Sequence, residues 1–476
     1  MKKDASKKHA DKDSAPIKIA EPVAVDRRPR ADRKDEGKAM RLAVPLASHA
    51  QWHAPANRRD PIDLLIESSV GRVPELLPIR YGRMMQSPFA FYRGAAAINA
   101  ADLAGLPSTG IRVQACGDCH LLNFGCFGTP ERQLIFAIND FDETLPAPWE
   151  FDIKRLAASF VVAGRHNGFS ADEAREATQA CVRSYREHMR EFAKMGVLDV
   201  WYFRIDAEAL VATVEDETAS RRAKKRIAKA RDRDVLDEDF PELVTFEGGA
   251  HRIRDNPPLI YHLQGVEAEG YDALVREAFG GYRATLPEDR RALLDRYELK
   301  DIARKVVGVG SVGTRCSIML LMGGADDPLF LQVKEARTSV LEPYAGQSIY
   351  QNHGQRVAMG QRHMQSATDI FLGWTGSERG YHFYIRQLRD MKIKPLVELF
   401  GPALMNQYAE ACGWALARAH ARSGDAAKIA GYLGKKEDFD EAIADFSESY
   451  ADQNENDYKA FVQAVQQGRL EVYLER

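Results

Sequence analysis

The stretch Val306–Lys334, VVGVGSVGTRCSIMLLMGGADDPLFLQVK, carries the pattern that decides the fold. Gly308, Gly310 and Gly313 have the spacing G-x-G-x-x-G, which occurs in dinucleotide-binding folds when a helix follows the glycines. Here an apolar run, Cys316–Met322, follows instead, and a Gly-Gly turn separates it from a second apolar run. Two short apolar runs joined by turn residues are typical of a β-hairpin. The stretch therefore predicts strand, turn and strand, which argues against a dinucleotide fold.

The glycines and the lysine of this stretch indicate how it could hold a ligand. A glycine-rich turn between two strands, followed by a lysine on the next strand, is the arrangement with which kinases cover the phosphates of ATP. We expect Lys334 to contact the α- and β-phosphates. The residues expected to lie over the phosphates are Gly308, Gly310, Ser311 and Gly313. The alternative is an ordinary hairpin with a surface lysine.

A second constellation lies almost two hundred residues earlier, in the segment Gly117–Asn123, GDCHLLN. An Asp followed five residues later by an Asn is the spacing of a phosphotransferase catalytic loop. We expect Asp118 to accept the proton of an attacking hydroxyl group. Asn123 would help to hold Mg2+ through its side-chain oxygen. The pair is weak alone, because such a spacing is expected by chance in a chain of this length.

Asp140 and Asp142 strengthen the hypothesis of a catalytic loop. They follow the β-like run Leu134–Ile138, and Asp140 lies seventeen residues past Asn123. Kinases place the carboxylate that bridges the metal to the nucleotide phosphates in an Asp-Phe pair after such a strand. A hard dication needs oxygen ligands, so the expected metal ligands are Asn123, Asp140 and Asp142. The alternative is a polar loop in which Asp118 caps a turn and Asp140 caps a helix.

The cysteines allow two competing interpretations of the same loop. Cys116-Gly-Asp-Cys119-His120 matches the C-x-x-C-H site of covalent haem attachment, and the same residues with Cys126 could form a zinc site. Haem attachment normally needs export, and a zinc site would draw Asp118 into a tight knuckle. Six cysteines in 476 residues are typical of reduced thiols, so we expect small buried thiols here.

Two other acidic positions need separate interpretation. Glu150 and Asp152, at a helix start, are expected to orient the catalytic loop. His420 and Asp425 resemble a second catalytic loop, but Ala430 stands five residues after Asp425 and cannot hold a metal. We expect that segment to be a helix C-terminus that ends at a glycine.

Composition divides the chain into a tail and three parts. Residues 1–50 have few large apolar side chains and are expected to be a disordered tail. The other parts are a helical large lobe with both loops (51–295), a β-rich nucleotide lobe (296–392) and C-terminal helices that complete the large lobe (393–476). Helices are expected over 153–164, 171–195, 396–422 and 438–468, with helical segments up to about residue 303, and a strand over 381–388.

Charge and composition exclude several classes of protein. With 45% apolar and 28% charged residues, the chain is neither wholly disordered nor collagen-like nor a disulfide scaffold. Lys and Arg number 66 against 69 Asp and Glu, so the net charge of -3 excludes a polybasic nucleic-acid coat. No apolar run of about 18 residues could span a membrane, and the cationic N-terminus lacks the apolar segment of a secretory signal. A cytoplasmic protein without membrane contact is expected.

One basic segment remains. Arg221–Arg233 contains eight basic residues and one acid. A solvated helix face is the simpler interpretation, and a patch that binds nucleic acid is the more specific one. Without interleaved aromatic residues for base stacking, nucleic-acid binding is the lesser alternative.

Five segments resemble a widespread bacterial family of unknown function over about residues 55–470. They are RVPELLPIRYGRMMQSPFAFYRG (72–94), GDCHLLNFG (117–125), NDFDETLPAPWEFDIKRLAASF (139–160), FLQVKEARTSVLEPY (330–344) and LARAHARSGD (416–425). The loop Gly-Asp-x-His-x-x-Asn with a following strand-Asp-Phe is also similar to that of aminoglycoside and choline phosphotransferases, relatives of protein kinases. This similarity implies that Asp118 is the catalytic base and that His120 is the loop histidine of those families. By the same resemblance, Asn123 and Asp140 are metal ligands and Lys334 is the phosphate lysine.

In kinases the glycine-rich strands and their lysine precede the catalytic loop, whereas here they follow it. The resemblance therefore implies an α+β, protein-kinase-like fold of two lobes that is circularly permuted. Glu342 is the candidate partner of Lys334. The implied function is an ATP- and Mg2+-dependent phosphotransferase that acts on a hydroxyl group of an unidentified small molecule or protein. The main alternative is a catalytically inactive nucleotide sensor or scaffold, because no obvious glutamate partner for the lysine is present.

Overall fold

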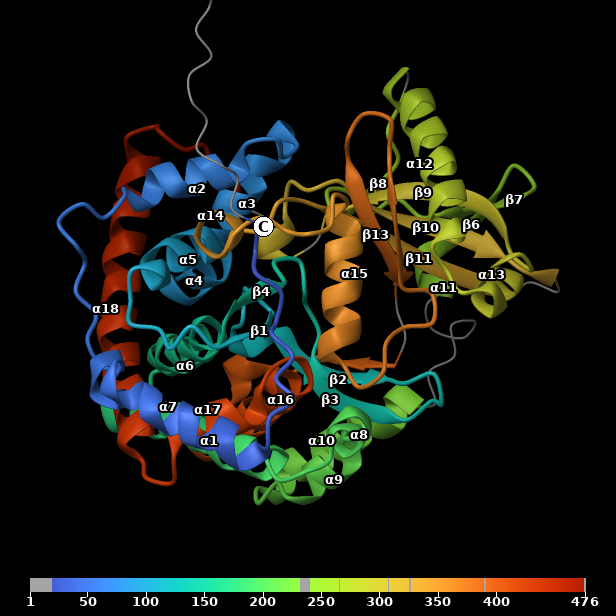
Figure 1. The fold of residues 1–476 in the computed structure, drawn as a ribbon. Coiled ribbons are helices and arrows are strands. Elements are labelled where there is room, and N and C mark those ends of the chain that lie inside the picture. The colour runs from blue at the N-terminus through green and yellow to red at the C-terminus, as the bar shows by residue number, and fades with distance from the viewer. Residues whose placement is uncertain are drawn as a thin grey trace, which may run out of the picture.

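A six-stranded antiparallel sheet forms one half of the molecule, on the right in Figure 1. The structure is a computed structural model that describes residues 19–231, 240–264, 266–306, 308–324, 327–388 and 391–474. In spatial order the strands are β12 (Gly373–Gly376), β13 (His382–Gln387), β11 (Pro328–Ala336), β10 (Cys316–Met322), β9 (Glu298–Lys305) and β8 (Ile260–Tyr261). The predicted hairpin is confirmed as β10 and β11, which pair with Cys316 opposite Lys334. The glycine turn joins β9 to β10.

Both faces of this sheet are covered, which explains its uninterrupted apolar runs. All seven residues of β10 and all nine of β11 are buried. One face packs against α12 (Val266–Ala284) and α13 (Glu288–Leu294). On the other face, residues of β6 (Val244–Glu247) and β7 (Ala250–Ile253) join a second apolar cluster. A strand that is covered on both faces needs no polar alternation.

Helices form the other half, around α6 (Trp149–His166), α7 (Ala171–Phe192), α16 (Pro402–Ser423) and α18 (Asp438–Gln466). These bounds confirm the four predicted helices. Ser170 and Glu173 form a capping box at the start of α7. The axes of α7 and α16 approach so closely that a Cβ atom on Gly413 would overlap the carbonyl oxygen of Cys181.

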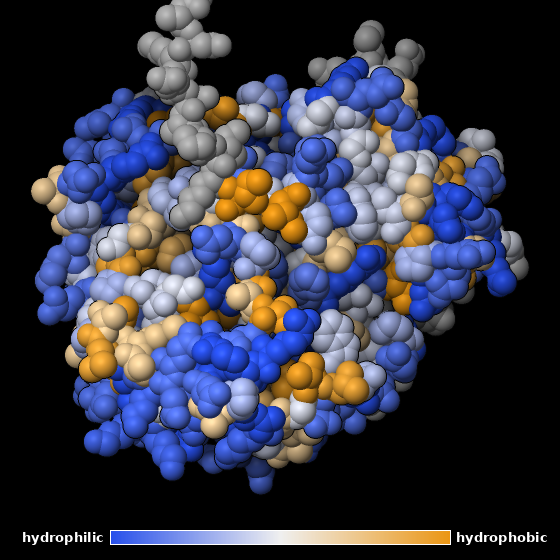
Figure 2. All heavy atoms as spheres, in the orientation of Figure 1, coloured by the Kyte–Doolittle hydropathy of each residue, from blue (hydrophilic) through white to orange (hydrophobic). Residues whose placement is uncertain are grey.

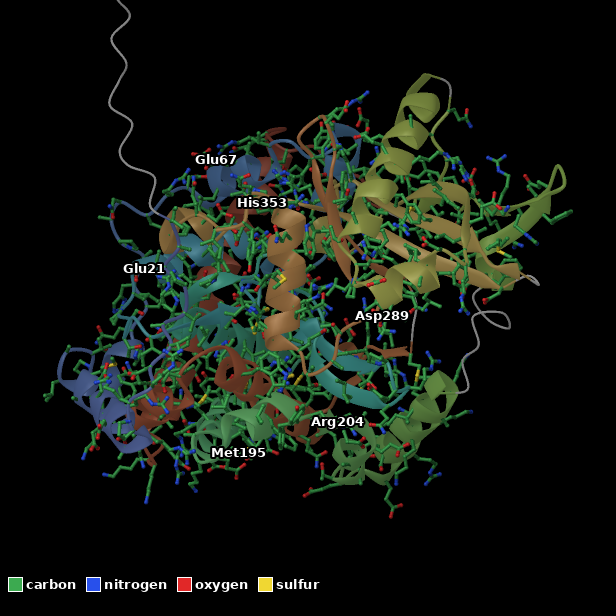
Figure 3. All side chains as sticks on the ribbon, turned by 45° about the vertical axis from the view of Figure 1, so that its right-hand side comes forward. Glu21, Glu67, Met195, Arg204, Asp289 and His353 are labelled. Carbon is green, nitrogen blue, oxygen red and sulfur yellow. The ribbon has the colours of Figure 1, made fainter. Side chains whose placement is uncertain are left out.

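Two small sheets in the helical half carry the loops of interest. One has the order β14 (Lys392–Ile393), β2 (Phe124–Gly128), β3 (Leu134–Ile138) and β5 (Ile205–Asp206). The other pairs β1 (Arg112–Ala115) with β4 (Leu145–Pro148). Helix α15 (His353–Met364) stands between the helical half and the large sheet, and Figure 3 labels His353 at its start.

The remaining described elements surround these units. Helices that precede β1 are α1 (Arg30–Ala39), α2 (Pro61–Ser69), α3 (Leu77–Met84), α4 (Pro88–Gly94) and α5 (Ala96–Ala104). Shorter or peripheral helices are α8 (Val197–Tyr202), α9 (Ala207–Ala212), α10 (Glu217–Arg231), α11 (Phe240–Leu243), α14 (Glu342–Ala345) and α17 (Ala426–Leu433). Two 3₁₀ turns, η4 (Leu121–Asn123) and η6 (Val309–Ser311), lie in the predicted site.

The expectation of a disordered tail over residues 1–50 is wrong for its second half, while residues 1–18 lie outside the described residues. Helix α1 packs against α17, where the backbone at Gly37 contacts that of Lys428 closely. Lys428 also forms ion pairs with Glu36, at 2.9 Å, and with Asp26, at 3.1 Å. Ion pairs and a glycine contact thus dock this segment, so its lack of large apolar residues was misleading.

The expectation of helical segments up to about residue 303 is also wrong. Residues 298–305 form β9 rather than the end of a helix. The sheet unit begins earlier than residue 296, because β8 pairs with β9 and α12 packs on β12. Only Ile302 and Ala303 of β9 are buried. The strand therefore lacks the apolar run that identifies its neighbours.

No helix in the described part of the chain is both long and apolar enough to cross a membrane. Figure 2 shows a predominantly hydrophilic face with apolar side chains in small, scattered groups. Scattered exposed apolar residues are normal for a globular protein.

Candidate functional site

Two strand pairs bring the two predicted loops together. Ala115 of β1 lies opposite Leu145 of β4, and Phe124 of β2 lies opposite Ile138 of β3. The Asn139 amide also donates a hydrogen bond of 2.7 Å to the Asn123 carbonyl oxygen. Residues 116–123 and 139–144 therefore leave neighbouring strands side by side. This arrangement places five predicted site residues in one region: Asp118, His120, Asn123, Asp140 and Asp142.

Asp152 holds the first loop from the start of α6, as predicted. Its carboxylate accepts hydrogen bonds from the backbone amides of Cys116, at 2.6 Å, and Gly117, at 3.0 Å. Gly117 has φ +85°, and a Cβ atom there would lie 2.5 Å from the carbonyl oxygen of Glu143. The turn therefore requires glycine. His420, which is fully buried, faces Asp152 at 3.2 Å.

Asp118 forms an ion pair that sequence analysis did not identify. The guanidinium group of Arg155 donates to Asp118 Oδ1 from Nη2 and, at 2.7 Å, from Nε. Arg155 is buried beneath Tyr92, whose ring centre lies 4.6 Å from the guanidinium carbon. Asp118 keeps 20% of its side-chain surface exposed, so its second oxygen remains the candidate base. Arg155 stands on the buried face of α6, and nothing in the sequence pattern marks it as special.

His120 and Asn123 shape the loop around this carboxylate. Burial lowers the pKa of His120 to about 3, so the imidazole is neutral near pH 7. Its Nδ1 accepts a hydrogen bond of 3.3 Å from the Leu122 amide, and its Nε2 lies 3.9 Å from Asp118 Oδ2. The side-chain amide nitrogen of Asn123, Nδ2, donates a hydrogen bond of 2.6 Å to the backbone carbonyl oxygen of Asp118. This leaves the amide oxygen of Asn123 as the atom that could ligate a cation.

Asp142 is the partner of Lys334, although 192 residues separate them in the sequence. The ammonium group lies 2.7 Å from Asp142 Oδ2, which also accepts from Ser311 Oγ at 2.9 Å. Tyr384 donates to Oδ1 at 2.6 Å. Burial acts to raise the pKa of Asp142, but Lys334 and these hydrogen bonds outweigh it and lower the pKa to about 2. The candidate partner Glu342 instead lies 3.7 Å from His353 Nδ1, so that expectation is wrong.

Asp140 has a different environment from Asp142. Burial and the neighbouring Asp142 raise its pKa, and its Oδ1 accepts from the Asp142 amide at 3.2 Å. A cation between two carboxylates favours the ionised form of both, because it offsets the repulsion between their charges. With Asn123 they offer the all-oxygen donor set that Mg2+ prefers. The residues present therefore fit the expected metal ion.

A cavity of about 700 Å³ brings together nine of the ten predicted site residues. Those that line it are Asp118, His120, Asn123, Asp140, Asp142, Gly308, Gly310, Ser311 and Lys334. Gly313 does not line the cavity. It has φ +86° and lies against Arg72, so it serves the turn and does not cover a ligand.

The cavity also contains basic residues that sequence analysis missed. They are Arg72, Arg80, Arg93, Lys305, Arg386, Lys392 and Lys394. With Lys334, eight cationic side chains face five carboxylates among the described lining residues. These cations come from several separate helices, strands and loops, so no local motif reveals them. The lining is suited to an anionic ligand.

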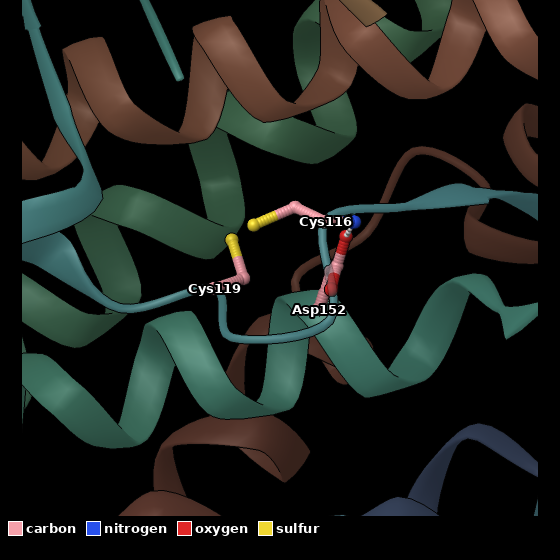
Figure 4. A group of neighbouring side chains, drawn as sticks. All are labelled: Cys116, Cys119 and Asp152. Carbon is pink, nitrogen blue, oxygen red and sulfur yellow. Dashed lines mark hydrogen bonds between the residues drawn. The ribbon is translucent and has the colours of Figure 1, made fainter. Parts of the chain in front are cut away.

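The cysteine cluster adjoins this cavity, and Cys116 is one of the lining residues. Figure 4 shows the Cys116 and Cys119 thiols pointing toward each other, with the Asp152 carboxylate beside the backbone of Cys116. Possible ligand atoms of these three residues lie within 4.8 Å of one another. Cys126 is not part of the group, and Asp152 already accepts two backbone hydrogen bonds. Burial raises the pKa of Cys119 well above its usual value, as expected for an inert thiol.

Comparison with known proteins gives one match. No curated protein matches the chain, and no solved structure matches it. A family model described as an uncharacterized protein conserved in bacteria (DUF2252) matches residues 72–464, which include every residue of the candidate site. The chain belongs to this bacterial family.

Proposed function

We propose that this protein is an ATP- and Mg2+-dependent phosphotransferase that acts on a hydroxyl acceptor. The observation that carries the proposal is the meeting of two half-sites, almost two hundred residues apart in sequence, in one cavity. One half-site supplies the loop with Asp118 and Asn123, and the other supplies the glycine turn and Lys334. Either alone is a weak signal, but both belong to the same chemistry.

The order of elements favours a permuted kinase-like arrangement as part of this proposal. From β9 the chain passes through the glycine turn, β10, β11 with its lysine, α15, β12 and β13. The catalytic loop, the hairpin β2–β3 and the Asp-Phe segment precede all of these. Strand, glycine turn, strand, lysine and then a helix is the sequence of a kinase nucleotide lobe. A helical lobe that precedes it in the chain is what circular permutation would produce.

Each residue has a definite task in this proposal. Lys334 and the turn at Gly308–Ser311 bind and orient the phosphates of ATP. Asn123 and Asp140 would hold Mg2+, which neutralises charge on the phosphate oxygens. The acceptor oxygen attacks the γ-phosphorus while its proton passes to Asp118 Oδ2. A bond forms between that oxygen and phosphorus, and the bond to the bridging oxygen breaks, so ADP leaves with the electron pair.

Calorimetry with ATP tests the nucleotide half of the proposal. Wild type should bind ATP in a magnesium-dependent manner, and Lys334→Ala should weaken binding at least about tenfold. Lys436→Gln, on an exposed surface position, is the charge-matched control. If neither wild type nor control binds ATP with or without Mg2+, the nucleotide site is refuted.

Transfer from radiolabelled ATP to a panel of small alcohols, amino sugars and proteins tests the chemistry. Asp118→Asn should abolish transfer and leave nucleotide binding largely unchanged, because in the proposed reaction its carboxylate accepts the acceptor proton and does not contact the nucleotide. Circular dichroism would verify that the variant is folded, since Arg155 loses its ion-pair partner. Unchanged turnover in Asp118→Asn would show that Asp118 is not the catalytic base.

A second candidate is a nucleotide sensor without catalytic activity. The specific observation that favours it is the pairing of Lys334 with Asp142, because α15 contains no glutamate that could take this role. This candidate predicts ATP binding with no transfer to any acceptor and no hydrolysis. Transfer by wild type would exclude it.

A further inference from the structure

Lys392, Lys394 and Arg386 form a group of cations on the wall of the cavity. Arg386 lies near the end of β13, and the two lysines lie on or beside β14, which adds an edge strand to β2. Because β2 and β3 carry Asn123 and Asp140 at their ends, this edge places the cations next to the proposed metal ligands. Arg386 Nη1 donates to the Asn139 carbonyl oxygen at 3.4 Å, directly before Asp140.

The two lysines have little compensation from the described residues, whereas at Arg386 burial is outweighed by Tyr384 and nearby carboxylates, which raise its pKa. Within the described chain, no hydrogen bond or ion pair joins the ammonium group of Lys392 or Lys394 to another residue. The Nε atom of Arg386 is buried and has no hydrogen-bond partner. Arg386, burial and Lys394 together lower the pKa of Lys392 well below its usual value, and Asp140 is the carboxylate that acts against this repulsion. Like charges gathered without counter-charges destabilise a folded protein unless an anion joins them.

We propose that Arg386, Lys392 and Lys394 form a second anion subsite that binds a phosphate group. It lies on the Asp140 side of the cavity and adjoins the first subsite, because Arg386 and Lys334 lie on neighbouring strands beside the same Tyr384 ring. Guanidinium and ammonium groups make strong charge-assisted hydrogen bonds to phosphate oxygens. A divalent cation held by Asp140 would neutralise charge on a phosphate bound beside it. The role of this phosphate in a transfer reaction rests on the proposed function. The anion subsite itself rests on the cations alone.

Two sources could supply this phosphate. One is the phosphate chain of the nucleotide itself, which would then extend across the metal site from Lys334 toward Lys392. The other is a phosphate group already present on the acceptor. Both have the same chemistry at the subsite, and an experiment can separate them.

The test uses inorganic triphosphate, which has neither base nor sugar, in calorimetric titrations with Mg2+. Lys392→Gln and Arg386→Gln should each weaken triphosphate binding by about 10- to 100-fold, the value of one charge-assisted hydrogen bond. Lys436→Gln should bind as wild type does. Equal affinity in wild type and both subsite variants overturns the proposal.

Thermal stability provides a second readout, which should not fall when triphosphate affinity falls. Because Lys392 is repelled by Arg386, Lys392→Gln should leave the thermal midpoint unchanged or raise it while it weakens triphosphate binding. A lysine with only a structural role would give the reverse, a lower midpoint at unchanged affinity. That result would overturn the proposal even if ATP is bound and transferred.

A final titration identifies the source of the phosphate. Inorganic phosphate that still binds to the ATP-saturated protein, and less well to Lys392→Gln, assigns the subsite to a phosphorylated acceptor. Phosphate that binds only in the absence of ATP assigns it to the nucleotide. If ATP neither binds nor reacts, but triphosphate binding still depends on Lys392, the phosphotransferase proposal fails and the anion subsite stands.

Discussion

Replacing Asp142 by Asn tests whether a buried ion pair ties the large sheet to the helical half. Lys334 is 4% exposed, and its ammonium group lies 2.7 Å from Asp142, whose side chain is 24% exposed. Asp142→Asn leaves the lysine buried without its counter-charge, which destabilises a protein by about 3–5 kcal/mol. Lys334→Met should cost less, about 1–3 kcal/mol, because Asp142 keeps its hydrogen bonds from Tyr384 and Ser311.

Urea unfolding followed by circular dichroism at pH 7 measures these changes in the free energy of unfolding. The double variant should lose less than the sum of the two single variants, with a coupling energy of about 1–3 kcal/mol. Lys436→Gln is the control for loss of a lysine. Stability of Asp142→Asn within about 0.5 kcal/mol of wild type would refute the ion pair as a stabilising contact.

The same ion pair predicts a pH dependence. Lys334 and the hydrogen bonds outweigh burial and lower the pKa of folded Asp142 to about 2, below its value in the unfolded chain. The carboxylate therefore contributes its full stabilisation above about pH 4, and the contribution is lost as the pH falls toward 2. Wild type should lose more stability over this range than Asp142→Asn. Parallel losses in the two proteins would contradict the lowered pKa.

Three further changes test other parts of the structure. A Cβ atom at Gly310 would lie 3.7 Å from the Arg93 carbonyl oxygen and 3.9 Å from the Asp118 carboxylate, so under the proposed function Gly310→Ala should slow turnover with little change in stability. Gly308→Ala, with open space around its Cβ position, should leave turnover closer to wild type. Gly413→Ala would force α7 and α16 apart and should lower the free energy of unfolding by about 1–3 kcal/mol or more in a urea titration. The Cys119 thiol acts to lower the pKa of Cys116, but burial and the nearby carboxylates together outweigh it and raise the pKa to about 11. Iodoacetamide at pH 8 should therefore modify Cys116 at least about tenfold more slowly than a free cysteine, and rapid labelling in the native protein would contradict its burial.

Local patterns were sufficient for the elements that carry the site. The apolar runs at 316–322 and 328–336 predicted the hairpin, and the Ser170 signal predicted the start of α7. These features depend on neighbouring residues, so the sequence contains them directly. Strand β9 and helix α1 were missed for the opposite reason. Both are largely polar and are held by hydrogen bonding to a neighbouring strand or by ion pairs to distant residues.

The contacts inside the site could not be predicted from spacing. Arg155 binds Asp118 from a helix whose residues are almost all buried, and its position in the sequence resembles that of any core residue. Lys334 meets Asp142 only because two sheets from different parts of the chain face the same cavity. Sequence motifs identify which residue types a chemistry needs. They do not identify which acidic side chain pairs with which basic side chain.

The position of Asp142 has a consequence for how the cavity could respond to a ligand. Lys334, Tyr384 and Ser311 all belong to the sheet half, and all three bind this one carboxylate of the helical half. A phosphate that contacts Lys334 and the glycine turn therefore competes with Asp142 for the same donors. Because these contacts also join the two halves, the proposed phosphate binding would be coupled to the relative position of the halves. The cations at Arg386 and Lys392 lie outside this contact, so they can attract an anion before the carboxylate is displaced.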